Sequence, residues 1–201
     1  MTLDRYADVV VEGVLTILST RDETAFADAR ATGAWCRRLC EAMNLSLAQT
    51  DFIVKAAILH DIGKIGTPDA ILFKPGPLTD AEWTTMKRHS DFGAEILAEL
   101  PALAQYAPIV RAHHERWDGT GYPQGLKGEQ IPLEARIVAV AGAFHAMISD
   151  RPQRPAIAQR DAMTILRDGR STQWDATIVE AMLTLLNAPR TAAHSRYVAQ
   201  R

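Results

Sequence analysis

The chain has 201 residues, 47% of them hydrophobic, and a formal net charge of −2 at pH 7. This size suits one hydrophobic core. The near-neutral charge and the lack of a basic block argue against DNA as a partner. No stretch is long and apolar enough to cross a membrane, and the N-terminus lacks the pattern of a secretion signal. We therefore expect a cytoplasmic protein that makes no membrane contact.

Apolar residues recur at three- and four-residue steps through most of the chain, which is the spacing of amphipathic helices. Two of the expected helices begin with a capping box, formed by Ser46 with Gln49 and by Thr79 with Glu82. The expected helices cover, in chain order, residues 3–19, 23–43, 47–64, 79–89, 91–100, 103–116, 133–148, 156–168 and 174–187.

No segment keeps the alternating pattern of a β-strand for more than a few residues. We therefore predict an all-α fold, a single bundle of about eight to nine helices. Residues 22–187 are expected to form this domain. The N-terminal helix (1–21) is expected to pack on its core or on a partner, and residues 188–201 to form a tail with little to pack against. Cys36 and Cys40 lie one helical turn apart and are expected to stay reduced.

Histidines gather at the ends of the expected helices. A single histidine is more often a packed or surface residue than a ligand, but here Asp61 follows His60 and two further histidines are adjacent. Helical bundles hold metals between side chains of facing helices, and imidazole with carboxylate suits divalent transition metals. The sequence therefore predicts a metal site in the core of the bundle, within reach of Lys64 one turn after His60. The candidate ligands are His60, Asp61, His89, His113 and His114.

The length and order of these motifs resemble the HD-GYP family, the cyclic di-GMP phosphodiesterase branch of the HD metal-dependent phosphohydrolases. The similarity covers about residues 22–187 and is dense from 56 to 154. It implies an HD-type helical bundle. The stretches that carry it are HDIGKIG at 60–66, KPGPL at 74–78, His89, HHERWDG at 113–119, GYP at 121–123, SDRP at 149–152 and Arg154.

The resemblance implies an active site with two, sometimes three, divalent metal ions, often iron or manganese. By position, Asp61 would bridge two of them at the catalytic centre. His89, His113 and His114 would complete the shell of one ion, while His60 would bind the other. Two such ions activate water and stabilise the attacking and leaving oxygens of a phosphodiester.

The resemblance also implies the residues that meet the substrate. Lys64 would contact the scissile phosphate or assist proton transfer, and is the second expected catalytic residue. Gly121 and Tyr122 with their loop would line the substrate groove, together with Arg151 and Arg154. Arginines make bidentate contacts to phosphate or to a guanine edge. Without the motif, both arginines are equally well explained as solvated residues beside a turn.

Two positions depart from the family pattern, and both affect the metal that His60 would bind. The family's His-x-x-Arg on the second helix falls on Asp28 and Ala31, and the aspartate of its central helix falls on Gly142, which has no side chain. Asp28 can still supply a carboxylate oxygen. His145, one turn from Gly142, is a candidate replacement, and its alternative is a packed or surface histidine. We therefore expect one or two metal ions per chain.

The resemblance predicts an enzyme, a metal-dependent phosphodiesterase that hydrolyses cyclic di-GMP to pGpG or GMP, weakened by the altered metal site. The alternative is a catalytically degenerate domain that binds cyclic di-GMP or a protein partner as a signalling module, which Asp28 and Gly142 favour. A third option is a phosphohydrolase of another nucleotide. The apolar stripe of residues 1–21 is an expected surface for a homodimer or a signalling partner.

Overall fold

The computed structural model describes residues 3–150 and 154–188, and within these ranges it contains helices and no β-strand. The prediction of an all-α fold is confirmed. None of the described helices is long and apolar enough to span a membrane. In chain order the helices are α1 (Leu3–Arg21), α2 (Glu23–Ala42), α3 (Leu47–Leu59), η1 (Ile62–Gly66), α4 (Asp69–Leu72), α5 (Asp80–Lys87), α6 (His89–Ala98), η2 (Ala104–Tyr106), α7 (Ala107–Ala112), η3 (Gly128–Gln130), α8 (Leu133–Ile148), α9 (Gln159–Asp168) and α10 (Ala176–Asn187).

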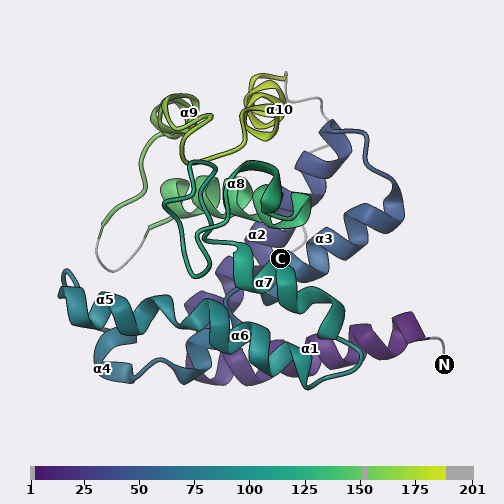
Figure 1. Cartoon of the computed structure of the whole chain (residues 1–201), viewed down its shortest axis with the longest axis vertical. Helices are drawn as coiled ribbons and strands as arrows, with labels where there is room; N and C mark the ends of the chain where they lie inside the picture. Colours follow the sequence, from purple (N-terminus) through teal and green to yellow (C-terminus); the bar gives the residue numbers. More distant parts are fainter. Residues whose placement is uncertain (1–2, 151–153, 189–201) are drawn as a thin grey trace, which may run out of the picture.

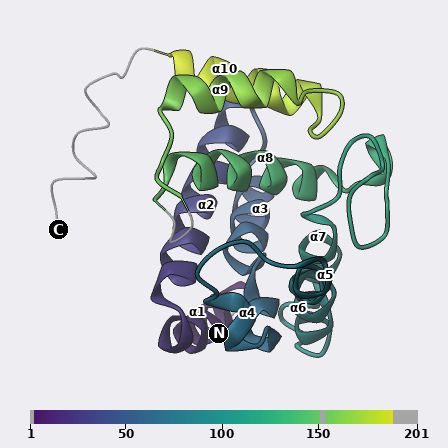
Figure 2. The ribbon, with the colours of Figure 1, turned by 90° about the vertical axis from the view of Figure 1, so that its left-hand side faces the viewer.

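Helix α8 crosses the middle of the bundle, as its nearly continuous apolar sequence requires (Figure 1). It packs on α2 and α3 on one side, and α9 and α10 cover its other side as an outer layer (Figure 2). Ile137, Val140 and Phe144 of α8 are fully buried. Helices α6 and α7 pack on each other, and α6 also packs on η1. The histidines and Asp61 stand where these inner elements meet.

Both predicted capping boxes are confirmed. The hydroxyl of Ser46 accepts a hydrogen bond from the backbone N–H of Gln49 (3.3 Å), and the hydroxyl of Thr79 accepts one from that of Glu82 (3.4 Å). In each box the acidic or amide side chain reaches back to the backbone N–H of the cap residue. The starts of α3 and α5 are therefore fixed by local sequence.

The helix boundaries around the predicted site differ from expectation in several places. The expected helix 103–116 is η2 followed by α7, which ends at Ala112. Helix α3 ends at Leu59, and the chain passes through a turn at His60 and Asp61 into the 3₁₀ helix η1. His89 begins α6 instead of ending the preceding helix. The one-turn helix α4 lies between the expected helices 47–64 and 79–89. The site residues thus lie at junctions, where a change of backbone direction turns their side chains toward one another.

Helix α1 is tied to the turn that carries Asp61. Its buried face joins the core, and its last residue, Arg21, reaches η1. The Arg21 guanidinium donates hydrogen bonds to the carbonyl oxygens of Lys64 (3.0 Å), Ile65 and Thr67 and to the carboxylate of Asp69 (2.6 Å). These bonds tie the end of α1 to the end of η1 and to the start of α4.

The two cysteines are buried and not bonded to each other, as predicted. Burial raises the pKa of Cys36 well above its ordinary value and that of Cys40 to about 11. Both therefore remain protonated, unreactive thiols at neutral pH.

Candidate metal centre

Four side chains converge between η1, α6 and the end of α7. Their ligand atoms lie within 4.8 Å of one another, and this is the only such group among the residues that the structure describes. Oδ1 of Asp61 lies 3.4 Å from Nε2 of His89 and 4.0 Å from Nε2 of His113, and these two nitrogens are 3.3 Å apart. The four residues are Asp61, His89, His113 and His114.

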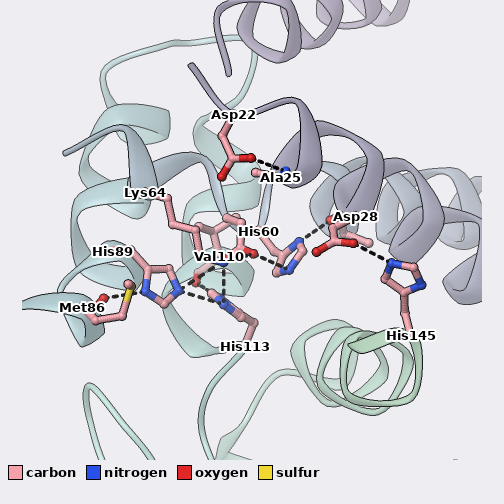
Figure 3. A network of polar contacts seen from close by, with 12 residues as sticks. Asp22, Ala25, Asp28, His60, Lys64, Met86, His89, Val110, His113 and His145 are labelled. Carbon is pink, nitrogen blue, oxygen red and sulfur yellow. Dashed lines mark hydrogen bonds and ion pairs between the residues drawn. The ribbon is translucent and has the colours of Figure 1, made fainter. Parts of the chain in front are cut away.

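The histidines are oriented by their own backbone. Nδ1 of His60, His89 and His113 lies 2.6, 2.7 and 2.6 Å from the carbonyl oxygen three residues earlier (Figure 3). A carbonyl oxygen only accepts hydrogen bonds, so each Nδ1 carries a proton, and a neutral ring held in this way presents the lone pair of Nε2 to the site. Metal-binding histidines are typically held in this way. Sequence reasoning placed these histidines at helix ends but did not foresee the carbonyl contacts.

The charges of the cluster fit a divalent cation. Burial alone would raise the pKa of Asp61, but His60 and Lys64 hold it well below its ordinary value. Burial lowers the pKa of His89 and His113, and that of His114 to about 3. At neutral pH the cluster is therefore a carboxylate among neutral imidazoles, the donor set of divalent transition metals. A cation would also relieve the repulsion between lone pairs that face each other in a buried space.

The protein stripped of metal is expected to lose stability as the pH falls below about 6.5. An imidazole titrates near 6.5 in the unfolded chain but near 3 for His114 in the fold, so the unfolded state binds more protons between these values. Acid then favours unfolding, by about 1.4 kcal/mol for each unit of lowered pKa. Urea unfolding of chelator-treated protein between about pH 8 and about pH 4 measures this slope. An unfolding free energy independent of pH over that range would contradict it.

Two glycines bring η1 against α6. A Cβ atom on Gly63 would overlap the carbonyl oxygen of His89 and lie 2.5 Å from the backbone nitrogen of Gly93. Neither Gly63 nor Gly66 has a positive φ, so the backbone conformation alone does not require glycine there. Their small size instead permits close packing, against His89 and Gly93 for one and against Phe92 for the other. This approach sets Asp61 opposite His89.

Replacing Gly63 with alanine is expected to separate η1 from α6 and to lose bound metal. Overpacking of this kind destabilises a protein by about 1–3 kcal/mol. Gly142→Ala is a matched control, because a Cβ atom there meets only Cγ2 of Thr32, at an ordinary 3.7 Å. Thermal unfolding and metal content measure both effects. Equal metal content in Gly63→Ala and in the wild type would show that the glycine contact does not position the cluster.

A cavity of about 270 Å³ joins the cluster to Lys64 and to helices α2 and α8. Oδ2 of Asp61 lies 2.6 Å from Nζ of Lys64 and 3.3 Å from Nε2 of His60. The two oxygens of Asp61 thus face in different directions, one toward His89 and His113 and the other toward His60 and Lys64. The lining includes Asp28, Thr32, His60, Asp61, Lys64, His113, His114, Arg116, Gly142, Gln173 and Trp174.

The altered half of the site contains an Asp–His pair. Asp28 of α2 and His145 of α8 face each other on the far side of His60 from His89 (Figure 3), with Oδ1 of Asp28 2.9 Å from Nε2 of His145. Asp28 and Gly142 line the cavity with His60. Within residues 3–150 and 154–188, however, Asp28, His60 and His145 do not form a second group of converging ligand atoms. The structure brings Asp28 and His145 to the site, but as a pair with each other.

The GYP loop rests on the cluster. The Tyr122 ring stacks on the His114 ring with centroids 4.8 Å apart. The buried carboxylate of Glu115 accepts hydrogen bonds from the backbone N–H groups of Gln124 (2.7 Å) and Leu126 (3.1 Å), which anchors the loop. A side chain on Gly121 would overlap the backbone beside Glu115. Sequence reasoning did not assign a role to Glu115, although its place directly after the two histidines was a signal.

Of the two arginines predicted to bind substrate, the structure describes only Arg154. Arg151 lies outside the described residues. Arg154 donates hydrogen bonds to the carbonyl oxygens of Ala146 (2.6 Å) and Met147 (3.4 Å) near the end of α8. It is not among the residues that line the cavity, so its predicted contact with substrate stays a prediction.

The helical fold and the oriented histidines around Asp61 define a class, the helical domains that carry a candidate metal site in their core. The chain belongs to the HD domain family, whose model matches residues 13–178. A Thermotoga maritima protein named cyclic di-GMP phosphodiesterase is 41% identical over 90% of this chain and 50% of its own length. A Vibrio cholerae protein named 3'3'-cGAMP-specific phosphodiesterase 3 is 33% identical over 92% of this chain and 40% of its own.

Solved structures agree with this assignment of the fold. Bd1817, described as an HDGYP protein from Bdellovibrio bacteriovorus, superposes with a TM-score of 0.70 over 92% of this chain and 64% of its own, at 18% identity. The predicted resemblance to HD-GYP proteins is confirmed. The chain spans half or less of the length of the curated relatives it matches first.

Proposed function

We propose that the chain is a metal-dependent phosphodiesterase that hydrolyses cyclic di-GMP to pGpG or to GMP. The observation that supports this most is the set of imidazole nitrogens and the Asp61 carboxylate that meet beside Lys64 at one cavity. The names of the relatives, which refer to cyclic di-GMP and to cGAMP, support a cyclic dinucleotide as the substrate class.

One metal ion is assigned to Asp61, His89, His113 and His114. A second is assigned to His60 and the other oxygen of Asp61, with Asp28 as a further oxygen ligand. Iron or manganese matches these nitrogen and oxygen donors. When bound, such ions activate water and stabilise the charge that develops on the phosphodiester.

His145 is proposed to orient Asp28, which it meets at 2.9 Å, and not to bind metal itself. The Asp28–His145 contact supports Asp28 as a carboxylate ligand supplied by α2. Gly142 supplies no ligand, so fewer protein groups would hold the second ion than the first.

Lys64 and Tyr122 are proposed to meet the substrate, and Gly121 to position the loop that carries Tyr122. Lys64 holds its ammonium 2.6 Å from Asp61, and we assign it to the negative charge of the scissile phosphate. Burial raises the pKa of the Tyr122 phenol, so the ring meets substrate as a neutral hydrogen-bond donor. Its stacking on His114 closes one side of the cluster against water. Gly121 gives the loop the close backbone contact that this position needs.

Product analysis tests the proposal. Protein purified without chelator is incubated with cyclic di-GMP and with manganese or iron(II), and the products are separated by chromatography. The expected products are pGpG or GMP, and turnover should stop with excess chelator. Hydrolysis of cGAMP or of another nucleotide in preference to cyclic di-GMP would favour a phosphohydrolase of that nucleotide.

A second candidate is a binding module, because Gly142 leaves one ligand position of the family pattern without a side chain. In that case the protein binds cyclic di-GMP, or a protein partner, without cleaving it. Calorimetric titration that shows binding, together with no product after prolonged incubation, would establish this candidate. Residues 22–187 are the proposed unit for either function. The proposed surface for a homodimer or a partner is the exposed face of α1 that carries Tyr6, Val9 and Ile17.

A further inference from the structure

The cavity beside the metal centre is too small for the whole proposed substrate. Its volume is about 270 Å³. Pockets that enclose a small molecule typically measure about 300–1,000 Å³. In a cyclic dinucleotide such as cyclic di-GMP, two phosphodiester groups join two purine nucleosides into one ring. If the scissile phosphate lies beside Lys64, at least one base must lie outside the cavity, on the neighbouring surface.

A row of stacked groups leads from the cluster to that surface. The Tyr122 ring stacks on His114. Nζ of Lys87 lies 5.4 Å from the centre of the Tyr122 ring and 6.0 Å from the centre of the Trp83 ring. Trp83 and Lys87 are four residues apart on α5 and therefore share one face of the helix.

Trp83 is 46% exposed, although tryptophan side chains are usually largely buried. Helix α5, which carries it, is held at its start by the Thr79–Glu82 capping box and by the ion pair of Glu82 with Lys74 (2.6 Å). The indole is thus an open aromatic face on the helix whose Lys87 contacts Tyr122 of the GYP loop.

We propose that Trp83 and Lys87 form a purine-binding shelf for the base that lies outside the cavity. The inference rests on the proposed function and adds a residue pair that selects the substrate. The indole offers a stacking face, and base–aromatic stacking is a major source of affinity for nucleic-acid bases. The Lys87 ammonium only donates hydrogen bonds, and it matches the O6 and N7 acceptors of guanine.

Kinetics with two substrates test the shelf. Cyclic di-GMP carries the base, and bis(p-nitrophenyl) phosphate carries a phosphodiester without one. In Trp83→Ala, KM for cyclic di-GMP is expected to rise by about 5- to 100-fold, the loss of one base stack, with a much smaller change in kcat. The ratio of kcat/KM for cyclic di-GMP to that for the base-free diester falls by the same factor. Trp83→Phe, which keeps an aromatic face, is expected to retain most of this preference.

The matched control is Phe73→Ala, since Phe73 is similarly exposed (51%) but is not part of the stacked row. The affinity of a hydrolysis-resistant phosphorothioate analogue of cyclic di-GMP, measured by calorimetry, provides a readout that does not need turnover. Wild-type protein that neither binds the analogue nor cleaves cyclic di-GMP would overturn the proposed function, and the shelf with it. Normal binding and turnover in the wild type, with Trp83→Ala equal to Phe73→Ala, would overturn the shelf alone.

Discussion

Asp61→Asn is expected to lose bound metal and to lower kcat/KM for cyclic di-GMP by about a thousandfold or more. Metal ions contribute several kcal/mol to phosphoryl transfer, and about 1.4 kcal/mol corresponds to a factor of ten in rate. Asp61 is the residue whose two oxygens face both halves of the site, toward His89 at 3.4 Å and toward His60 at 3.3 Å. Asparagine keeps the size but replaces one oxygen with an N–H₂ group, which cannot bind metal.

Asp51→Asn in α3, the helix that precedes Asp61, is the control, because that carboxylate is half exposed and pairs with Arg37. Both variants are checked by circular dichroism, by elemental analysis and by product analysis. A folded Asp61→Asn protein with the metal content and the turnover of Asp51→Asn would contradict the assignment of Asp61 as the central ligand.

Gly142→Asp is expected to increase both metal content and turnover. Gly142 lines the cavity with His60 and Asp61, and a Cβ atom there meets only Cγ2 of Thr32 at 3.7 Å. A carboxylate therefore fits at the position that the family pattern fills with aspartate. If it completes the second half-site, the rate is expected to rise about tenfold or more, since a metal ion contributes several kcal/mol.

Gly142→Ala separates this effect from simple filling of space, because alanine adds the Cβ atom without a ligand. In the absence of metal, Gly142→Asp should be less stable than Gly142→Ala, because it buries a further carboxylate near Asp61. Added manganese should reverse that order. If Gly142→Asp and Gly142→Ala hold the same amount of metal and turn over cyclic di-GMP equally, the second half-site is not limited by residue 142.

Local sequence patterns predicted most of the helices. Apolar spacing located them, and the capping boxes at Ser46 and Thr79 fixed the starts of α3 and α5. The end of α3 was placed five residues too far along the chain, since helical periodicity continues through His60 and Asp61. What ends the helix is the packing of η1 against α6, a contact between distant segments that local patterns do not contain.

Motifs identified the candidate ligands, and the structure brings four of them together while Asp28 and His145 pair with each other. The four are Asp61, His89, His113 and His114. The contacts that hold the turn of Asp61 and the GYP loop in place could not be predicted, because they join segments that meet only in the tertiary structure. Gly63 packs against the backbone of His89, a residue far along the chain. The bonds from Arg21 to η1 and from Glu115 to the GYP loop join residues whose proximity follows only from the fold.

Elemental analysis of the native protein, purified without chelator, tests the central claim most directly. We predict at least one equivalent of iron or manganese per chain, bound at Asp61, His89, His113 and His114. His113→Ala should lose it, because Nε2 of His113 faces both Asp61 and His89. Protein that retains no divalent transition metal, and takes up none when manganese or iron(II) is added, would contradict the account.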